Sequence, residues 1–227
     1  MLSDEIYGKL HHENEHHSIV PLYPEGTIFS GGLSKWCGAG GWRLGVFVFP
    51  KCLRWLQDAM AAVASETFTS TSAPIQYAAV CAFKGGMELE RYLWNTRKIL
   101  KALANKIYQK LDKAGIVVPK PDGAFYMFPD FLNFADKLHK KRILTSSQFC
   151  ERLLYDTGVA ILPGVAFGRN ENEFTARLAF VDFDGSRAIA AAEQLDQDHQ
   201  LNSEFTEAYC NGTLKAIDVL CDWLKSL

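Results

Sequence analysis

The strongest constraint on the fold is a glycine-rich loop that lies between two short apolar runs. Thr27 to Ser30 and Leu44 to Phe49 are apolar and β-prone, and glycine and proline bound them. Runs of this length and composition are typical of buried strands, so we predict two strands that flank the loop. Pro50 closes the second strand, because proline cannot donate to a ladder.

Helical periodicity follows the second strand. Lys51 to Ser65, Ile75 to Phe83 and Met87 to Ala114 each predict a helix, and Gly115 stands where a C-cap glycine would end the third. The third helix carries a row of apolar residues on one face: Leu89, Leu93, Ile99, Leu103, Ile107 and Leu111. Its length allows it to bridge two domains.

The second half of the chain alternates between strand-like and helical segments. Strands are predicted at Ala124 to Phe128, Val159 to Leu162 and Arg177 to Phe183, and a helix at Ser147 to Asp156. The tail from Ser203 to Leu227 reads as amphipathic helix and serves packing. This alternation predicts the α/β fold class with a compact second domain.

Composition excludes several classes of function. The 227 residues carry a net charge of −2, so the chain lacks the basic footprint of a nucleic-acid-binding protein. Six cysteines are scattered singly, which indicates reduced thiols and a cytoplasmic location. The longest apolar runs are far shorter than the ~20 residues of a membrane helix, and the N-terminus has no signal pattern. We expect neither a membrane nor a nucleic acid as partner.

Four histidines near the N-terminus are candidate metal ligands. They are His11, His12, His16 and His17. Their spacing does not match the H-E-x-x-H pattern of a zinc site, and we expect a solvated loop and no metal.

The chemistry-bearing segment is the loop itself, Gly32 to Gly45, which reads GLSKWCGAGGWRLG. It resembles the attachment-site motif of class I aminotransferases, enzymes that use pyridoxal 5′-phosphate (PLP). By this resemblance Lys35 forms a Schiff base with PLP, which requires an amine that becomes neutral near physiological pH. Arg43, eight residues on, would bind the phosphate through its guanidinium fork. The alternative is a surface lysine in a flexible loop.

One position of the motif departs from the family. Members often carry serine three residues before the lysine, where its hydroxyl contacts the phosphate, and this chain has Gly32 there. Ser30 and Ser34 are the candidates to replace that hydroxyl, and we assign Ser34 to the cofactor site.

Asp4-Glu5-Ile6-Tyr7 resembles the D-x-x-Y segment of the same family. The resemblance implies that Asp4 pairs with the protonated pyridine nitrogen of PLP and that Tyr7 binds its 3-hydroxyl group. A buried carboxylate keeps that nitrogen protonated, as an electron sink requires. A strand-end turn is the alternative interpretation.

Arg177 lies in the segment TARLAF, which follows PGVAFG at Pro163 to Gly168. The pair resembles the substrate-binding segment of the family, and Arg177 would then bind the α-carboxylate of the amino acid. A bidentate arginine suits a planar carboxylate better than lysine does. A surface charge at a strand start is the alternative.

Two further segments resemble the family and remain open. Asp122 to Tyr126 is similar to a segment that lines the substrate side of the small domain, and it is equally a turn leading into a strand. Ser70 to Pro74 corresponds to a segment that contacts the cofactor of a neighbouring subunit, and it is equally a helix cap.

The resemblance implies a fold type I PLP-dependent transferase of which this chain is the C-terminal half. Residues 1–98 would belong to the large PLP-binding domain and residues 99–227 would form the small α/β domain. Family members carry a further N-terminal half, which supplies the rest of the sheet, a phosphate-binding helix N-terminus and dimer contacts.

The implied function is that of a transaminase, which transfers an amino group between an amino acid and a 2-oxo acid in a homodimer. Lys35 would be both the anchor and the general acid/base. Two other functions stay open at this point: a catalytically silent fragment that acts as a folded assembly module, and a carbon–sulfur lyase of the same fold.

Overall fold

The computed structural model describes residues 1–195 and 200–227. The chain divides into two compact units, Met1–Arg97 and Lys98–Leu227, here named unit 1 and unit 2. No helix within the described residues combines the length and the apolar character that crossing a membrane requires.

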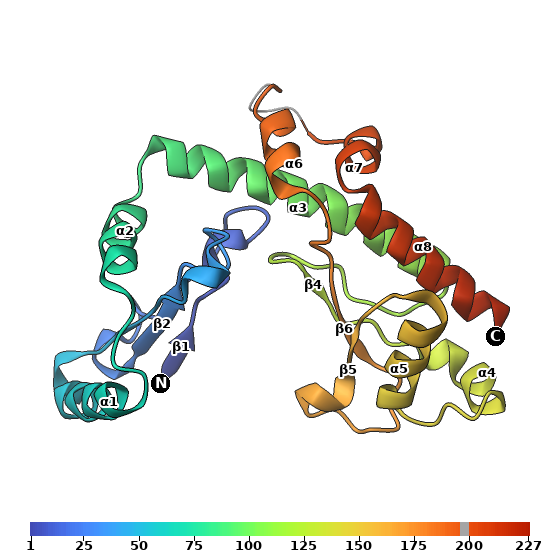
Figure 1. Ribbon diagram of the computed structural model, residues 1–227, viewed down its shortest axis with the longest axis horizontal. Coiled ribbons are helices and arrows are strands. Elements are labelled where there is room, and N and C mark those ends of the chain that lie inside the picture. The colour runs from blue at the N-terminus through green and yellow to red at the C-terminus, as the bar shows by residue number, and fades with distance from the viewer. Residues whose placement is uncertain (196–199) are drawn as a thin grey trace. The chain divides into compact units, whose positions relative to one another are not determined.

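Unit 1 is built on a three-stranded sheet in the order β1-β2-β3 (Figure 1). The strands are β1 (Leu2–Asp4), β2 (Ile28–Gly32) and β3 (Gly45–Val48). β1 and β2 run parallel, with Asp4 opposite Ser30, whereas β2 and β3 run antiparallel, with Gly32 opposite Gly45. The two strands predicted around the glycine-rich loop are present, and β2 is the central strand. The prediction that both are buried was wrong for β3, where Phe47 and Val48 are exposed.

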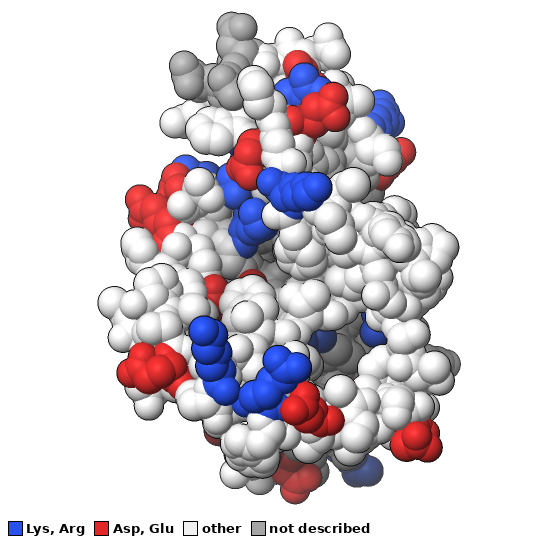
Figure 2. Space-filling model, turned by 90° about the vertical axis from the view of Figure 1, so that its left-hand side faces the viewer, with Lys and Arg blue, Asp and Glu red and all other residues white. Residues whose placement is uncertain are grey.

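Helices follow the sheet in unit 1. They are α1 (Arg54–Thr67), α2 (Ala73–Lys84) and the start of α3 (Met87–Lys113), with 3-10 helices η1 (Gly8–Leu10), η2 (Pro24–Gly26), η3 (Gly40–Trp42) and η4 (Lys51–Leu53). No residue of α1 is buried, and Trp55 and Val63 are 67% and 64% exposed. Uncharged side chains cover most of the face that carries α1 and α2 (Figure 2).

Unit 2 contains a small antiparallel sheet in the order β4-β6-β5, together with several helices (Figure 1). Its strands are β4 (Tyr126–Met127), β5 (Leu162–Pro163) and β6 (Ala176–Ala179). Its helices are α4 (Ala135–Lys140), α5 (Ser146–Thr157), α6 (Gly185–Ala192), α7 (Ser203–Tyr209) and α8 (Asn211–Ser226), with 3-10 helices η5 (Leu132–Phe134) and η6 (Gly164–Phe167).

Only part of the apolar row predicted on α3 contributes to the core of unit 2, because Leu89 and Leu93 belong to unit 1 and Leu89 is only partly buried. Leu103, Ile107 and Leu111 are fully buried, as are Leu153 of α5 and Leu224 of α8. Gly115 has φ +83 just after the last turn, the left-handed conformation expected of a C-cap glycine. Burial of this row fixes the register of the helix, because any rotation of α3 would expose it.

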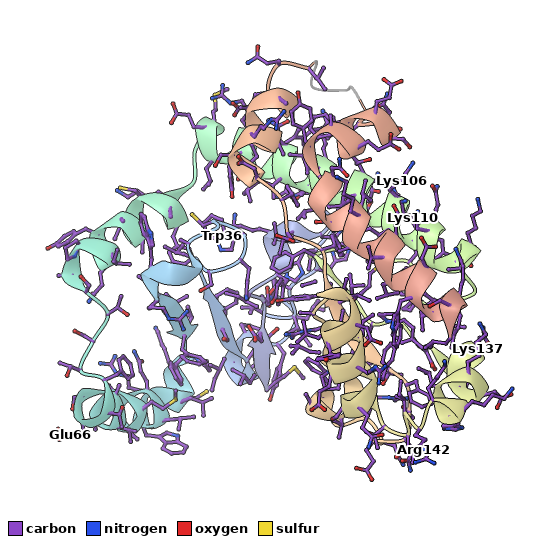
Figure 3. The ribbon with its side chains drawn as sticks, turned by 45° about the vertical axis from the view of Figure 1, so that its right-hand side comes forward. Trp36, Glu66, Lys106, Lys110, Lys137 and Arg142 are labelled. Carbon is purple, nitrogen blue, oxygen red and sulfur yellow. The ribbon has the colours of Figure 1, made fainter. Side chains whose placement is uncertain are left out.

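Charged pairs join α3 to the C-terminal helices. Lys106 Nζ lies 3.1 Å from a Glu207 carboxylate oxygen, and Lys110 pairs with Asp218 (Figure 3). Lys137 donates a hydrogen bond to the carbonyl of Lys225 at 3.0 Å, at the carboxyl end of α8. Exposed ion pairs contribute little to the free energy of unfolding. The buried leucines therefore contribute more to the stability of this helix packing than the lysine pairs do.

Several element boundaries differ from the sequence prediction. The strand expected at Ala124 to Phe128 covers only Tyr126–Met127. The strand expected at Val159 to Leu162 begins only at Leu162, and the one expected at Arg177 to Phe183 ends at Ala179, because each runs only as far as its ladder partner. The C-terminal tail forms two helices interrupted at Cys210. There Thr213 Oγ1 donates to the Asp182 carbonyl at 3.0 Å, so a tertiary contact sets the start of α8.

Two adjacent leucines of α5 allow a matched test of this core. Leu153 is fully buried, whereas Leu154 is 49% exposed. We expect Leu153→Ala to lower the free energy of unfolding by about 2–5 kcal/mol, because it leaves a cavity. Leu154→Ala changes helix propensity identically and should cost less than about 1 kcal/mol. Urea unfolding followed by far-ultraviolet circular dichroism measures both, and equal effects would contradict this packing.

Candidate functional site

Asp4 lies at the carboxyl end of β1, where the chain leaves the sheet. The Glu5 amide donates to the Ser30 carbonyl at 2.8 Å, and the Ile6 amide donates to Asp4 Oδ1 at 3.3 Å. The carboxylate is exposed and lies at the end of a strand. The turn then brings Tyr7 three residues further along, so both residues of the D-x-x-Y segment lie at one edge of the sheet.

Lys35 is presented by a loop that buried side chains hold in place. Leu33 and Trp36, which flank Ser34 and Lys35, are 1% and 4% exposed. The Leu33 amide donates to the Leu44 carbonyl at 3.3 Å, which closes the base of the loop. Lys35 Nζ lies 5.8 Å from the centroid of the Tyr7 ring. The structure therefore brings together two of the predicted cofactor residues, the amine and the phenol.

Arg43 ends the glycine-rich turn in an unusual backbone conformation. Its φ is +55, in the left-handed region, and its Nη1 donates to the Gly40 carbonyl at 2.8 Å. Thr71 Oγ1 donates to the Arg43 carbonyl at 3.4 Å. The side chain is exposed, so its remaining donors are accessible to an anion.

Gly32 has no room for a side chain. A Cβ there would lie 2.7 Å from the Leu44 carbonyl oxygen and 3.2 Å from Gly45 Cα, both backbone atoms of β3 and its approach. Close pairing of β2 with β3 leaves no space for a side chain at this position, where family members often have serine. Ser30, opposite Asp4 in the ladder, and Ser34, beside Lys35, remain the nearby hydroxyls.

Glu5 is a polar residue that the sequence analysis did not single out. Its side chain is 8% exposed and accepts hydrogen bonds from Ser18 Oγ at 2.6 Å and Ser3 Oγ at 3.0 Å, and it pairs with His16 Nε2 at 2.8 Å. Burial opposes ionisation, but these three partners outweigh it and hold the pKa of the carboxyl below its ordinary value. The alternation of Ser3, in β1, with Glu5, the residue that follows β1, was the available signal, because alternate residues of an extended chain share a face.

The histidine-rich segment is only partly the solvated loop that was predicted. His12 is 8% exposed, so the prediction of a solvated loop was wrong for this residue. The His16 ring nitrogen Nε2 is hydrogen-bonded to the Glu5 carboxylate. Within residues 1–195 and 200–227, no group of three or more acidic, histidine or cysteine side chains could hold a metal ion.

Arg177 lies in unit 2, on the central strand β6. It is opposite Leu162 of β5, and its guanidinium carbon lies 4.6 Å from the Tyr126 ring centroid and 4.5 Å from that of Phe167. Tyr126 belongs to β4 and Phe167 to η6, so the two segments singled out around Arg177 meet it in space. The guanidinium is partly exposed.

The comparisons with known proteins agree with this arrangement. The family model for aminotransferases of class I and II matches residues 1–207. The chain belongs to this family. Members of the family use pyridoxal 5′-phosphate, and the mixed α/β fold is that of part of a fold type I PLP-dependent enzyme.

Two curated bacterial aminotransferases are similar to this chain over most of its length. The chain is 33% identical over 180 residues to a probable N-acetyl-LL-diaminopimelate aminotransferase of Bacillus subtilis, with 79% of this chain and 42% of the relative covered. It is 34% identical over 177 residues to an aspartate aminotransferase of Geobacillus stearothermophilus, covering 76% and 43%. The chain thus spans less than half the length of these relatives.

Solved structures show the same relation. An aromatic aminotransferase from Pyrococcus horikoshii superposes with a TM-score of 0.72 at 28% identity, covering 99% of this chain and 51% of that one. A double mutant of the Thermus thermophilus aspartate aminotransferase gives a TM-score of 0.72 at 25% identity, covering 97% and 47%.

The side chains of unit 1 fit the cofactor of the family. PLP presents an aldehyde, a pyridine nitrogen, a 3-hydroxyl group and a phosphate. Unit 1 offers an amine (Lys35), a carboxylate (Asp4), a phenol (Tyr7) and an exposed guanidinium (Arg43). The backbone at Gly41 is open, with no atom within 4 Å of where a Cβ would stand. This donor set matches each polar group of PLP.

The tight approach at Gly32 can be tested against an open glycine of the same loop. We expect Gly32→Ala to destabilise unit 1 by about 1–3 kcal/mol, because the added methyl group overlaps rigid backbone. Gly41→Ala has free space and should change stability by less than about 1 kcal/mol. Thermal unfolding of both variants is the measurement. An unaffected Gly32→Ala variant would mean that β2 and β3 are further apart.

The Glu5 network should make stability depend on pH. A carboxyl whose pKa is depressed on folding stabilises the protein above its unfolded pKa, near 4.5, and loses that contribution as pH falls through the folded value. Glu5→Gln should therefore reduce stability most at neutral pH. Unfolding measured from pH 7 down to pH 3 should show the difference from the wild type shrinking below about pH 4.5. A difference that stays constant would contradict the network.

Proposed function

We propose that this chain provides the cofactor anchor and the carboxylate-binding arginine of a PLP-dependent aminotransferase. The reaction would transfer an amino group between an amino acid and a 2-oxo acid. The observation that carries the proposal is the placement of Lys35 beside Tyr7, on a loop held by Leu33 and Trp36 at the end of the sheet. Membership in the aminotransferase family supports it.

Each predicted residue has a role in this proposal. Lys35 Nζ would hold the cofactor, and its amine would move the proton at the substrate Cα. Asp4 would pair with the pyridine nitrogen, Tyr7 would bind the 3-hydroxyl group, and Ser34 and Arg43 would bind the phosphate. When bound, PLP withdraws electrons from the substrate Cα and so acidifies its C–H bond.

Arg177 would bind the α-carboxylate of the substrate. Its position on β6, between the flanking strands β4 and β5, gives it a rigid base. A guanidinium donates two parallel hydrogen bonds to one carboxylate, and this orients the Cα–H bond for proton removal.

The domain assignment and the cellular setting belong to the same proposal. Residues 1–98 would be part of a larger cofactor-binding domain and residues 99–227 a small domain, which the compact units 1–97 and 98–227 support. The homodimer and the cytoplasmic location are also proposed. Six unpaired cysteines support a reducing compartment.

Labelling of the cofactor lysine tests the proposal without any assumption about the substrate. We expect PLP and borohydride to give one pyridoxyl adduct, on Lys35, located by peptide mass mapping. Lys35→Ala should abolish it, whereas Lys51→Ala, which removes an exposed lysine of unit 1, should leave it unchanged. Labelling spread over many lysines would instead favour a catalytically silent assembly module.

Product analysis separates transamination from elimination. An aminotransferase needs a 2-oxo acid as acceptor, and Lys35→Arg should reduce its turnover to background because a guanidinium cannot take up the proton. Release of pyruvate and ammonia from a β-substituted amino acid without any acceptor would contradict the transaminase proposal and favour the carbon–sulfur lyase.

A further inference from the structure

Two aromatic rings hold the guanidinium of Arg177 from the two strands that flank it. The Tyr126 ring, on β4, lies 4.6 Å from the guanidinium carbon, and the Phe167 ring, which follows β5, lies 4.5 Å from it. Arginine stacks readily on aromatic faces, and such contacts strengthen when they are shielded from water. We name Tyr126 and Phe167 the aromatic clamp.

The strand registers explain how the clamp is built. Tyr126 pairs with Ala179 across β4 and β6, so it is the diagonal neighbour of Arg177 on the same face of the sheet. Diagonal neighbours lie within reach of aromatic and long side chains. Phe128, two residues beyond Tyr126, contacts the Phe167 ring edge-on at 5.7 Å and 87°. Tyr126 of β4 and Phe128, which follows β4, therefore contact Arg177 and Phe167 respectively.

A tight backbone contact places the second ring. The Gly164 amide donates to the Thr175 carbonyl at 2.7 Å, and a Cβ on Gly164 would lie 2.0 Å from Thr175 Oγ1. This approach packs the start of η6 directly against the residue that precedes β6. Phe167 ends the same 3-10 helix, so the contact sets its position relative to Arg177.

The rings hold the guanidinium, but they do not satisfy its donors. In the part of the chain that the structure describes, no carboxylate or carbonyl oxygen accepts a hydrogen bond from the Arg177 side chain. A partly exposed guanidinium held in this way can offer its edge to an external anion.

We propose that Tyr126 and Phe167 are positioning residues that make Arg177 selective for a planar carboxylate over a tetrahedral sulfonate or phosphonate. The inference rests on the proposed role of Arg177 and specifies its substrate class. A carboxylate places both oxygens in the plane of the guanidinium fork. A tetrahedral anion carries a further oxygen out of that plane, toward the negative face of a ring, which repels it.

Ligand binding to the 227-residue chain without cofactor tests this directly. In ¹⁵N-labelled protein, the Nε–H resonance of Arg177 is assigned by its loss in Arg177→Lys and then followed during titration with propionate or ethanesulfonate. In the wild type we expect saturable shifts with propionate at lower concentration than with ethanesulfonate. Neither enzyme activity nor PLP enters the measurement.

The variants separate the clamp from general structural effects. Tyr126→Leu and Phe167→Leu should each weaken propionate binding about two- to fivefold and reduce its preference over ethanesulfonate, the size expected for one lost cation–π contact. Tyr126→Phe keeps the ring and should retain wild-type behaviour. Tyr155→Leu removes an 87% exposed ring of α5 and is the matched control. Phe167 is 40% exposed, so Phe167→Leu should not disturb the core. It therefore tests the clamp even if Tyr126→Leu unfolds.

The outcomes distinguish failure of the clamp from failure of the proposed function. If propionate shifts the Arg177 resonance and both leucine variants retain wild-type affinity and preference, the clamp inference is overturned while the carboxylate-binding role of Arg177 stands. If ethanesulfonate binds the wild type as well as propionate does, the selectivity is likewise overturned. A resonance that no carboxylate shifts would overturn the carboxylate-binding role together with the clamp.

Discussion

The pairing of β2 with both of its neighbours is the constraint on which the cofactor side of unit 1 depends. Parallel pairing with β1 aligns Asp4 with Ser30, and antiparallel pairing with β3 aligns Gly32 with Gly45. The first ladder ends where the D-x-x-Y turn begins, and the second closes the base of the loop that carries Lys35. A shift of β2 by one residue would turn every side chain of the strand to the other face and dismantle both alignments.

Unit 2 reaches an equally rigid arrangement by a different route. Its strands are only two to four residues long, and such short ladders are weak alone. Burial of the apolar residues of α3, α5 and α8 supplies the stability instead. The small sheet then serves mainly to place side chains, and it brings Arg177 on its central strand close to the rings of Tyr126 on β4 and Phe167 on η6.

The two units differ in how much apolar surface they cover. α1 buries none of its residues, and Trp55, Val63 and Phe68 are each more than 60% exposed. Contiguous apolar surface of this kind is uncommon on monomeric proteins and usually marks a face that packs against something else. The chain spans less than half the length of the curated relatives named above.

The sequence by itself determined the fold class, the strands around the glycine-rich loop, the apolar row of α3 and the family resemblance. Those features depend on local periodicity and on a contiguous motif, which one stretch of chain encodes. Tertiary structure alone decided that Glu5 is buried with Ser3, Ser18 and His16, that Gly32 has no space for a side chain, where β5 and β6 end, and that two rings meet Arg177. Each of these depends on atoms brought together by pairing between distant segments, and spacing along the chain does not report such distances.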